Sequence, residues 1–142
     1  MRKVIDEKLK DNLRLFLENV DIESLSLVKL ALNVKESDTA GDVEVKADLS
    51  IRPKIEEDGK LSFLYNHKEK ILVEGKEINI EISYKLLLEY KGNVKELKRS
   101  ILMAYAKNSG LLLVYPYIRH LSDIIKREAG FIFSPLPHIL IK

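Results

Sequence analysis

Cysteine is absent from this 142-residue sequence, and so are the patterns that most often carry catalysis. Without a thiol, the chain has no disulfide framework, no thiolate metal site and no cysteine nucleophile. It contains neither a Gly-x-x-x-x-Gly-Lys-Ser/Thr phosphate loop nor a Gly-x-Ser-x-Gly nucleophile elbow. His67, His120 and His138 are not spaced as a metal pair, so each is expected at the surface or at a helix cap. These absences predict a non-enzyme with no cofactor, no metal and no catalytic residue.

Long apolar runs and a strong charge excess are missing as well. The longest apolar run, residues 111–115, is too short to cross a bilayer, and positions 1–20 mix charges throughout, unlike a signal peptide. We therefore expect a cytoplasmic protein without membrane insertion. The formal net charge of +2 argues against a nucleic-acid partner, because such a partner usually meets a clearly basic surface. Lys95, Lys98 and Arg99 could contact phosphate, but their spacing favours an ordinary solvent-facing helix side.

What is present is the composition of one globular domain covering residues 1–142. Hydrophobic residues make up 46% and charged residues 32% of the chain, which suits a single core. Apolar residues at helical spacing predict an N-terminal amphipathic helix at 2–18, within a segment 1–20. Residues 22–35 look extended, but their period-2 pattern slips by one residue between Leu27 and Val28, which predicts a β-bulge. Polar residues and a glycine at 36–42 predict a turn.

Three further extended segments complete a sheet predicted at 22–91. Residues 43–51 alternate without fault and predict a half-buried strand, whose far end Pro53 confines to a sheet edge or a strand terminus. The dipeptide Asp58-Gly59 predicts a hairpin turn. Two apolar stretches, 61–65 and 71–73, flank a polar patch at 66–70, so we expect this strand to be interrupted or partly exposed. After a turn at 74–76, residues 77–90 alternate cleanly and predict a strand.

The apolar period changes to that of helices in the segment 93–129. Asn93 and Glu96 have capping-box spacing, and Ser109-Gly110 predicts the end of a first helix. Pro116 suits the first turn of a second helix, which Gly130 should stop, leaving an extended tail at 130–142. The predicted fold class is α+β: a four-stranded antiparallel sheet, two C-terminal helices packed on one face, and an extra N-terminal helix.

One stretch of the sequence resembles the SecB family. The run Leu-Leu-Leu-Val-Tyr-Pro-Tyr-Ile-Arg at 111–119 precedes a predicted helix, a Gly-Phe pair at 130–131 and Pro137, and the strand at 44–49 also looks like the family's second strand. The resemblance spans roughly residues 22–139. The sequence ends at Lys142, before the long final helix and polar tail of bacterial SecB, and its pI of 8.7 contrasts with that family's acidic character. A partnership with the motor SecA is therefore doubtful.

The resemblance implies an ATP-independent chaperone, a holdase that binds unfolded or non-native polypeptides in apolar grooves, with protein export as one use that the family suggests. It also implies a homotetramer built as a dimer of dimers. Some relatives instead protect one antitoxin, so a dedicated toxin–antitoxin-associated chaperone with one specific client is the alternative, and a small-molecule enzyme comes third.

Candidate residues follow from the same stretch and from the strand at 77–90. Client-binding candidates are the apolar and aromatic groups near the predicted second helix and the tail, for which ordinary core packing is the competing interpretation: Leu113, Tyr115, Tyr117, Phe131, Phe133 and Leu136. Structural roles are expected for Pro116, Arg119, Gly130 and Pro137. The polar side of the strand at 77–90 could join a partner sheet in the oligomer, through Glu77, Asn79, Glu81 and Ser83.

Overall fold

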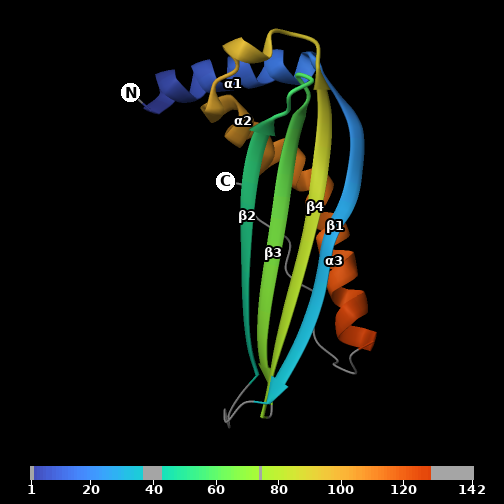
Figure 1. Cartoon of the computed structure of the whole chain (residues 1–142). Helices are drawn as coiled ribbons and strands as arrows, with labels where there is room; N and C mark the ends of the chain where they lie inside the picture. The colour runs from blue at the N-terminus through green and yellow to red at the C-terminus, as the bar shows by residue number, and fades with distance from the viewer. Residues whose placement is uncertain (1, 37–42, 74, 129–142) are drawn as a thin grey trace.

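Four long antiparallel strands form one sheet, and the helices lie at one end of it and across one of its faces (Figure 1). The structure is a computed structural model that describes residues 2–36, 43–73 and 75–128, with side chains from Lys8 onward. The elements are α1 (Arg2–Glu18), β1 (Val20–Glu36), β2 (Glu44–Ile55), β3 (Leu61–Val73), β4 (Lys76–Tyr90), the 3₁₀ turn η1 (Val94–Glu96), α2 (Arg99–Tyr105), the π-helical turn η2 (Ala106–Gly110) and α3 (Leu111–Glu128). The strand order is β1-β4-β3-β2, so β1 and β2 are the edges. The predicted α+β class is confirmed.

The register of β1 against β4 contains the predicted irregularity. The pairing shifts between Leu27 and Lys29, so Val28 is the extra residue of a bulge where the sequence pattern slips. A second shift, between Ile22 and Ser24, was not predicted. Because of the bulge, apolar side chains on both sides of it share one face of the sheet.

Tight turns close the two hairpins at the predicted glycines. Gly59 and Gly75 have φ of 82° and 77°, a left-handed conformation that glycine adopts without a Cβ clash. Pro53 lies on β2, opposite Phe63 of β3. β2 is an edge strand, which is where a proline without a backbone N–H can be accommodated. The predicted turn at 36–42 lies mostly outside the described residues.

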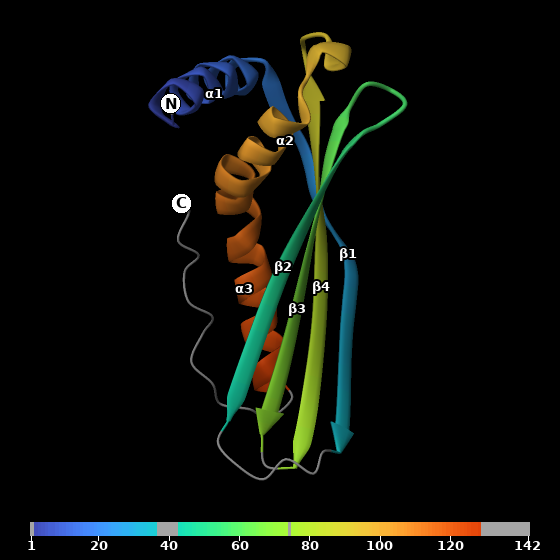
Figure 2. The same cartoon turned by 90° about the vertical axis from the view of Figure 1, so that its left-hand side faces the viewer.

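The core lies between the sheet and the helices (Figure 2). One side chain in two on β3 and β4 points toward α3, and we call this side of the sheet the inner face. α1 lies across one end of the sheet and is fixed by Phe16, whose ring centroid is 5.5 Å from that of Tyr90 and 5.3 Å from that of Tyr105. The described helices include none that is long and apolar enough to cross a membrane.

The predicted break between two C-terminal helices is wrong. Residues 106–110 form a π-helical turn that joins α2 to α3, so the chain stays helical through Ser109-Gly110. The Tyr65 hydroxyl donates a 2.7 Å hydrogen bond to the Ala106 carbonyl, a contact between residues 41 apart that local sequence does not reveal. Gly110 is needed there for space, because a Cβ would lie 2.3 Å from the Tyr65 hydroxyl oxygen.

Pro116 consequently lies inside α3 and does not start a helix. Pro116 is exposed, and so is Leu112, the residue one turn earlier whose carbonyl would otherwise accept a hydrogen bond from an N–H at position 116. The Asn93 cap is confirmed in a smaller element: its side chain accepts a hydrogen bond from Lys95 N, but only the turn η1 follows, and α2 begins at Arg99.

The structure decides between the two alternatives expected for the strand at 61–73. β3 is not interrupted at the polar patch 66–70 but is partly exposed there, at Lys68 and Lys70, and it is still the most buried strand of the sheet. β2, expected to be half-buried, is exposed along most of its length, including Val45 on its inner face. Position in the sheet explains both results, since β3 has a neighbour on each side and α3 above it, whereas β2 is an edge.

Candidate functional site

The inner face of β1 is apolar but uncovered. Leu27, Leu30, Leu32 and Val34 all point to the inner face, yet 44–50% of each side chain is exposed. They lie beside the core, because Leu30 and Leu32 pair with the buried Ile82 and Ile80 of β4. A row of large apolar side chains on an edge strand is a surface that another polypeptide can cover.

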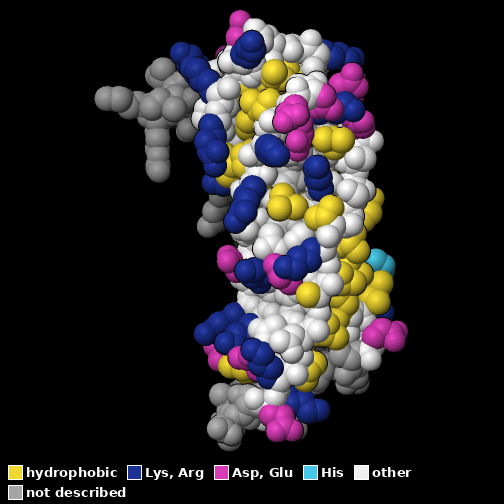
Figure 3. All heavy atoms as spheres, in the orientation of Figure 1, with side chains coloured by type: hydrophobic (Ala, Val, Ile, Leu, Met, Phe, Trp, Pro, Cys, Tyr) yellow, Lys and Arg dark blue, Asp and Glu magenta, His cyan; other side chains and the backbone are white. Residues whose placement is uncertain are grey.

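α3 supplies the second side of this apolar surface. Tyr117 is 51% exposed, and its ring centroid lies 6.0 Å from that of Tyr84, the β4 residue opposite Leu27. Ile124, two helical turns further along, is on the same side of α3 and is also exposed. We call the set Leu27, Leu30, Leu32, Val34, Tyr117 and Ile124 the β1–α3 strip. Figure 3 shows a band of hydrophobic side chains along the β1 margin of the molecule.

A groove at the α1 end of the sheet extends the exposed apolar surface. It has a volume of about 620 Å³ and is lined mostly by apolar side chains from α1, β1, α2 and α3: Leu17, Val20, Asp21, Ile22, Tyr105, Ser109, Leu112 and Leu113. We call it the upper groove. Ile22 and Leu112 are 57% and 65% exposed. With few polar groups to orient a small ligand, this lining suits generic apolar contact better than the recognition of one small molecule.

The outer face of the sheet, turned away from α3, carries many Lys, Arg, Asp and Glu side chains, with hydrophobic patches between them toward the α1 end (Figure 3). It carries a shallow concavity of about 520 Å³, whose lining includes Lys46, Lys68 and Lys70. The four predicted oligomer-interface residues lie on this face; three of them bond to neighbouring strands, and Asn79 bonds within β4. Glu77 pairs with Lys70 at 3.0 Å and Glu81 with Lys29 at 2.9 Å, and these hydrogen bonds lower the pKa of both carboxyls. The Ser83 hydroxyl donates to Asn66, and the Asn79 amide donates to Glu77.

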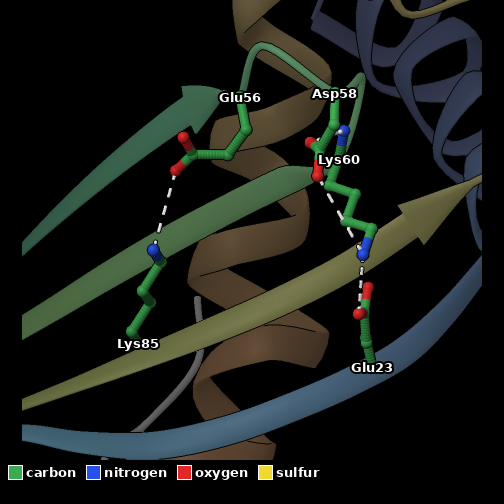
Figure 4. A network of polar contacts seen from close by, with 5 residues as sticks. All are labelled: Glu23, Glu56, Asp58, Lys60 and Lys85. Carbon is green, nitrogen blue, oxygen red and sulfur yellow. Dashed lines mark hydrogen bonds and ion pairs between the residues drawn. The ribbon is translucent and has the colours of Figure 1, made fainter.

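A smaller polar network links the β2–β3 turn to the neighbouring strands (Figure 4). Lys60 Nζ lies 2.7 Å from Glu23 Oε1 on β1, where the unpredicted register shift leaves Glu23 as an extra residue. Glu56 accepts a hydrogen bond from Ser62 and lies 3.7 Å from Lys85. These contacts are at the surface and offer no reactive pair in a cavity.

A buried charged cluster on the inner face was missed by sequence reasoning. Glu69 of β3 is fully buried, with Oε1 2.8 Å from His67 Nε2 and Oε2 2.8 Å from Lys126 Nζ of α3, and it accepts a short hydrogen bond from the Ser122 hydroxyl. Burial raises the pKa of the Glu69 carboxyl, but the bonds to His67, Lys126 and Ser122 outweigh burial and lower this pKa to about 2. We call these four residues the Glu69 cluster.

The sequence signal for this cluster was the position of its residues in the strand alternation and in the helical stripe. His67 and Glu69 continue the alternation of the buried Phe63 and Tyr65, and Ser122 and Lys126 continue the helical stripe of Ile118. The expectation that His67 is a surface or cap residue is therefore wrong. Within the described part of the chain, no group of three or more His, Cys, Asp or Glu side chains could hold a metal ion.

The predicted client-binding residues separate in the structure. Leu113 lines the upper groove and Tyr117 belongs to the strip, whereas Tyr115 lies on the other side of α3, where burial and then the nearby Glu69 charge raise its pKa. Arg119 lies half-buried on α3, on the same side as Tyr115. The remaining candidates lie outside the described residues: Phe131, Phe133, Leu136, Gly130 and Pro137.

Comparisons with known proteins bear on the fold. No protein-family model matches the sequence, and no curated protein matches it. Among solved structures, the chain is similar to the SecB-like chaperone Rv1957 of Mycobacterium tuberculosis, solved in complex with a ChAD peptide from the antitoxin Rv1956 HigA1, with a TM-score of 0.75 and 14% identity over 91% of this chain and 97% of that one. A protein of unknown function from Streptococcus agalactiae aligns with a TM-score of 0.41 and 14% identity over 84% and 97%, too low to carry an argument. The chain therefore has the fold of a SecB-like chaperone.

Proposed function

We propose that this protein is a cytoplasmic, ATP-independent chaperone that holds non-native polypeptide on the β1–α3 strip and the upper groove. The observation that carries the proposal is the exposed apolar inner face of β1, on a fold similar to that of a SecB-like chaperone. The similarity of the fold to that of a SecB-like chaperone supports a binding function over an enzymatic one.

The chemistry of the surface fits an unfolded client. An unfolded chain has no fixed shape, so it must be recognised by contacts that any apolar segment can make, and burial of apolar area contributes about 25 cal/mol per Å². The open edge of β1 adds a row of unpaired backbone N–H and C=O groups to which an extended client can add a strand. Alternate side chains of such a strand would face the strip.

Two double variants on β1 test the proposal. Leu30→Ser with Leu32→Ser removes apolar area from the strip, and Ala31→Ser with Asn33→Ser changes the outward-facing neighbours on the same strand. With reduced, carboxymethylated α-lactalbumin as a permanently unfolded probe and no nucleotide, we expect the inner-face variant to weaken Kd about 30-fold, from about 1 kcal/mol per leucine. The outer-face variant should bind as the unaltered protein does. Equal binding by both variants, or no binding by the unaltered protein, would refute the proposal.

A second copy of the chain is the other occupant that the strip could accept. We propose a homotetramer, a dimer of dimers, because several grooves on one particle raise the affinity for one long client through effective concentration. The polar outer face of β4, through Glu77, Asn79, Glu81 and Ser83, is the proposed interface. The mass of the oligomer in solution, measured for the unaltered protein and for the Leu30→Ser, Leu32→Ser variant, decides between these two surfaces. A change of oligomer mass in the variant would place the subunit contact on the strip and not on the outer face.

A dedicated chaperone for one client is the second candidate function, and the peptide bound to Rv1957 favours it. The two candidates predict different selectivity. A general holdase suppresses aggregation of several unrelated unfolded proteins at similar molar ratios, whereas a dedicated chaperone protects a single partner and leaves the others to aggregate.

A further inference from the structure

The buried side of α3 changes character halfway along the helix. Its buried residues are first apolar, Leu111, Val114 and Ile118, and then polar, Ser122 and Lys126. The first half is also fixed at its start by the Tyr65 hydroxyl bond to Ala106. The second half meets the sheet through Glu69, the central residue of the Glu69 cluster, and the apolar Leu121 and Ile125 beside this contact are only partly buried.

These two kinds of contact differ in how readily they are released. Apolar side chains lose hydrophobic stabilisation when water enters, and they gain nothing in return. A buried ion pair recovers much of its hydration when it opens, so it often stabilises the closed state no more than apolar side chains of the same volume would. The second half of α3 is therefore held more weakly than the first, although both halves are equally buried along this stripe.

Opening of the second half of α3 would expose sheet residues that lie directly beside the β1–α3 strip. Glu69 pairs with Ile80 of β4, which pairs with Leu32 of β1; His67, Ile82 and Leu30 form the adjacent row. α3 packs on β4, and both isoleucines are almost fully buried. Lifting the helix end would add the inner face of β4 to the exposed face of β1, giving a wider apolar surface.

We propose that the Glu69 cluster is a latch that closes the second half of α3 over the sheet, and that its release widens the surface on which a client binds. The widening rests on the proposed chaperone function, but the latch itself does not.

Hydrogen exchange of the full chain without client tests the latch. Lys126→Met removes the helix cation that meets Glu69, and Arg127→Met, its exposed neighbour on the same helix, is the matched control. At neutral pH we expect amides of residues 119–128 to exchange on the order of tenfold faster in Lys126→Met, because the helix end opens to hydrate Glu69. Residues 111–118 and the strands should keep their rates, and Arg127→Met should match the unaltered protein.

A second variant replaces the cluster with apolar groups: His67→Leu, Glu69→Leu, Ser122→Ala and Lys126→Leu. Residues 119–128 should then exchange no faster than in the unaltered protein, because apolar contact closes the helix end. Three results would overturn the latch: equal exchange in Lys126→Met and Arg127→Met, acceleration of the whole chain in Lys126→Met, or faster exchange of residues 119–128 in the apolar variant. Binding of the unfolded probe is measured separately, so a protein that binds no client can still show, or fail to show, the latch.

Discussion

Strands β3 and β1 lie in the same sheet and point alternate side chains to the same inner face. On that face β3 buries polar side chains, whereas β1 exposes apolar ones. β3 buries His67 and Glu69, whereas β1 leaves Leu30 and Leu32 about half exposed. β3 is central and covered by α3; β1 is an edge with a free side. The comparison teaches that position in the sheet, rather than composition, decides which residues form the core and which remain available for binding.

The same leucine-to-alanine change on the two strands should give the largest contrast. Leu61 on β3 is fully buried, and Leu30 on β1 is 49% exposed. We expect Leu61→Ala to lower the free energy of unfolding by about 2–5 kcal/mol, because it leaves a cavity. Leu30→Ala should cost less than about 1 kcal/mol, because little packing is lost. Urea unfolding of both variants measures the difference, and equal losses would mean that β1 is covered in solution, for example by a second copy.

The buried carboxylate of β3 should make stability depend on pH. Its pKa is about 2 in the folded protein, against an ordinary value of 4.5. A carboxyl whose pKa is lowered by folding adds stability that is fully present above pH 4.5 and is lost as pH falls toward 2, here about 3 kcal/mol. The free energy of unfolding, measured with urea between these pH values, should therefore fall more steeply with decreasing pH in the unaltered protein than in Glu69→Gln. Glu81→Gln, on the partly exposed outer face, should change the slope less; identical slopes in all three proteins would contradict this account.

Local signals predicted much of the fold. The period-2 pattern located the strands, its one-residue slip located the bulge at Val28, and Gly59 and Gly75 located the turns. Each of these features is determined by a few adjacent residues. The α+β class followed from the order of the segments, strands first and the two packed helices after them.

Contacts between distant segments explain what sequence reasoning missed. Glu69, in the polar patch of β3, can be buried because Ser122, 53 residues away, and Lys126 bond to it. The helix continues through Ser109-Gly110 because Tyr65 bonds to Ala106 across the core. The strip was missed because its exposure depends on strand order, which places β1 at an edge although its leucines look like core residues. Of the three predicted client residues that the structure describes, Leu113 and Tyr117 lie on the candidate surface and Tyr115 does not.

The contact between β3 and the π-helical turn should give an intermediate effect. A Cβ on residue 110 would lie 2.3 Å from the Tyr65 hydroxyl oxygen, so Gly110→Ala must displace a buried, bonded side chain. We expect a loss of about 1–2 kcal/mol, the overpacking cost being partly offset by the better helix propensity of alanine. Tyr65→Phe alone should cost about 1 kcal/mol for the lost hydrogen bond. Combined, the two changes should cost less than their sum, since the clashing oxygen is gone; strict additivity would show that the crowding lies elsewhere.

The smallest effect is expected from the ion pair that ties the β1 irregularity to the β2–β3 turn. Lys60 Nζ lies 2.7 Å from Glu23 Oε1 and 4.0 Å from Asp58 Oδ2, and the hydrogen bond to Glu23 raises the pKa of the ammonium (Figure 4). All three side chains are at least one-third exposed, so solvent and salt screen the attraction. Lys60→Met should shift the urea midpoint less than any change above, and the shift should disappear at roughly 0.5 M salt. A larger, salt-insensitive shift would show that β1 is held to the sheet by this polar contact as well as by its ladder with β4, and would weaken the conclusion that burial alone separates β3 from β1.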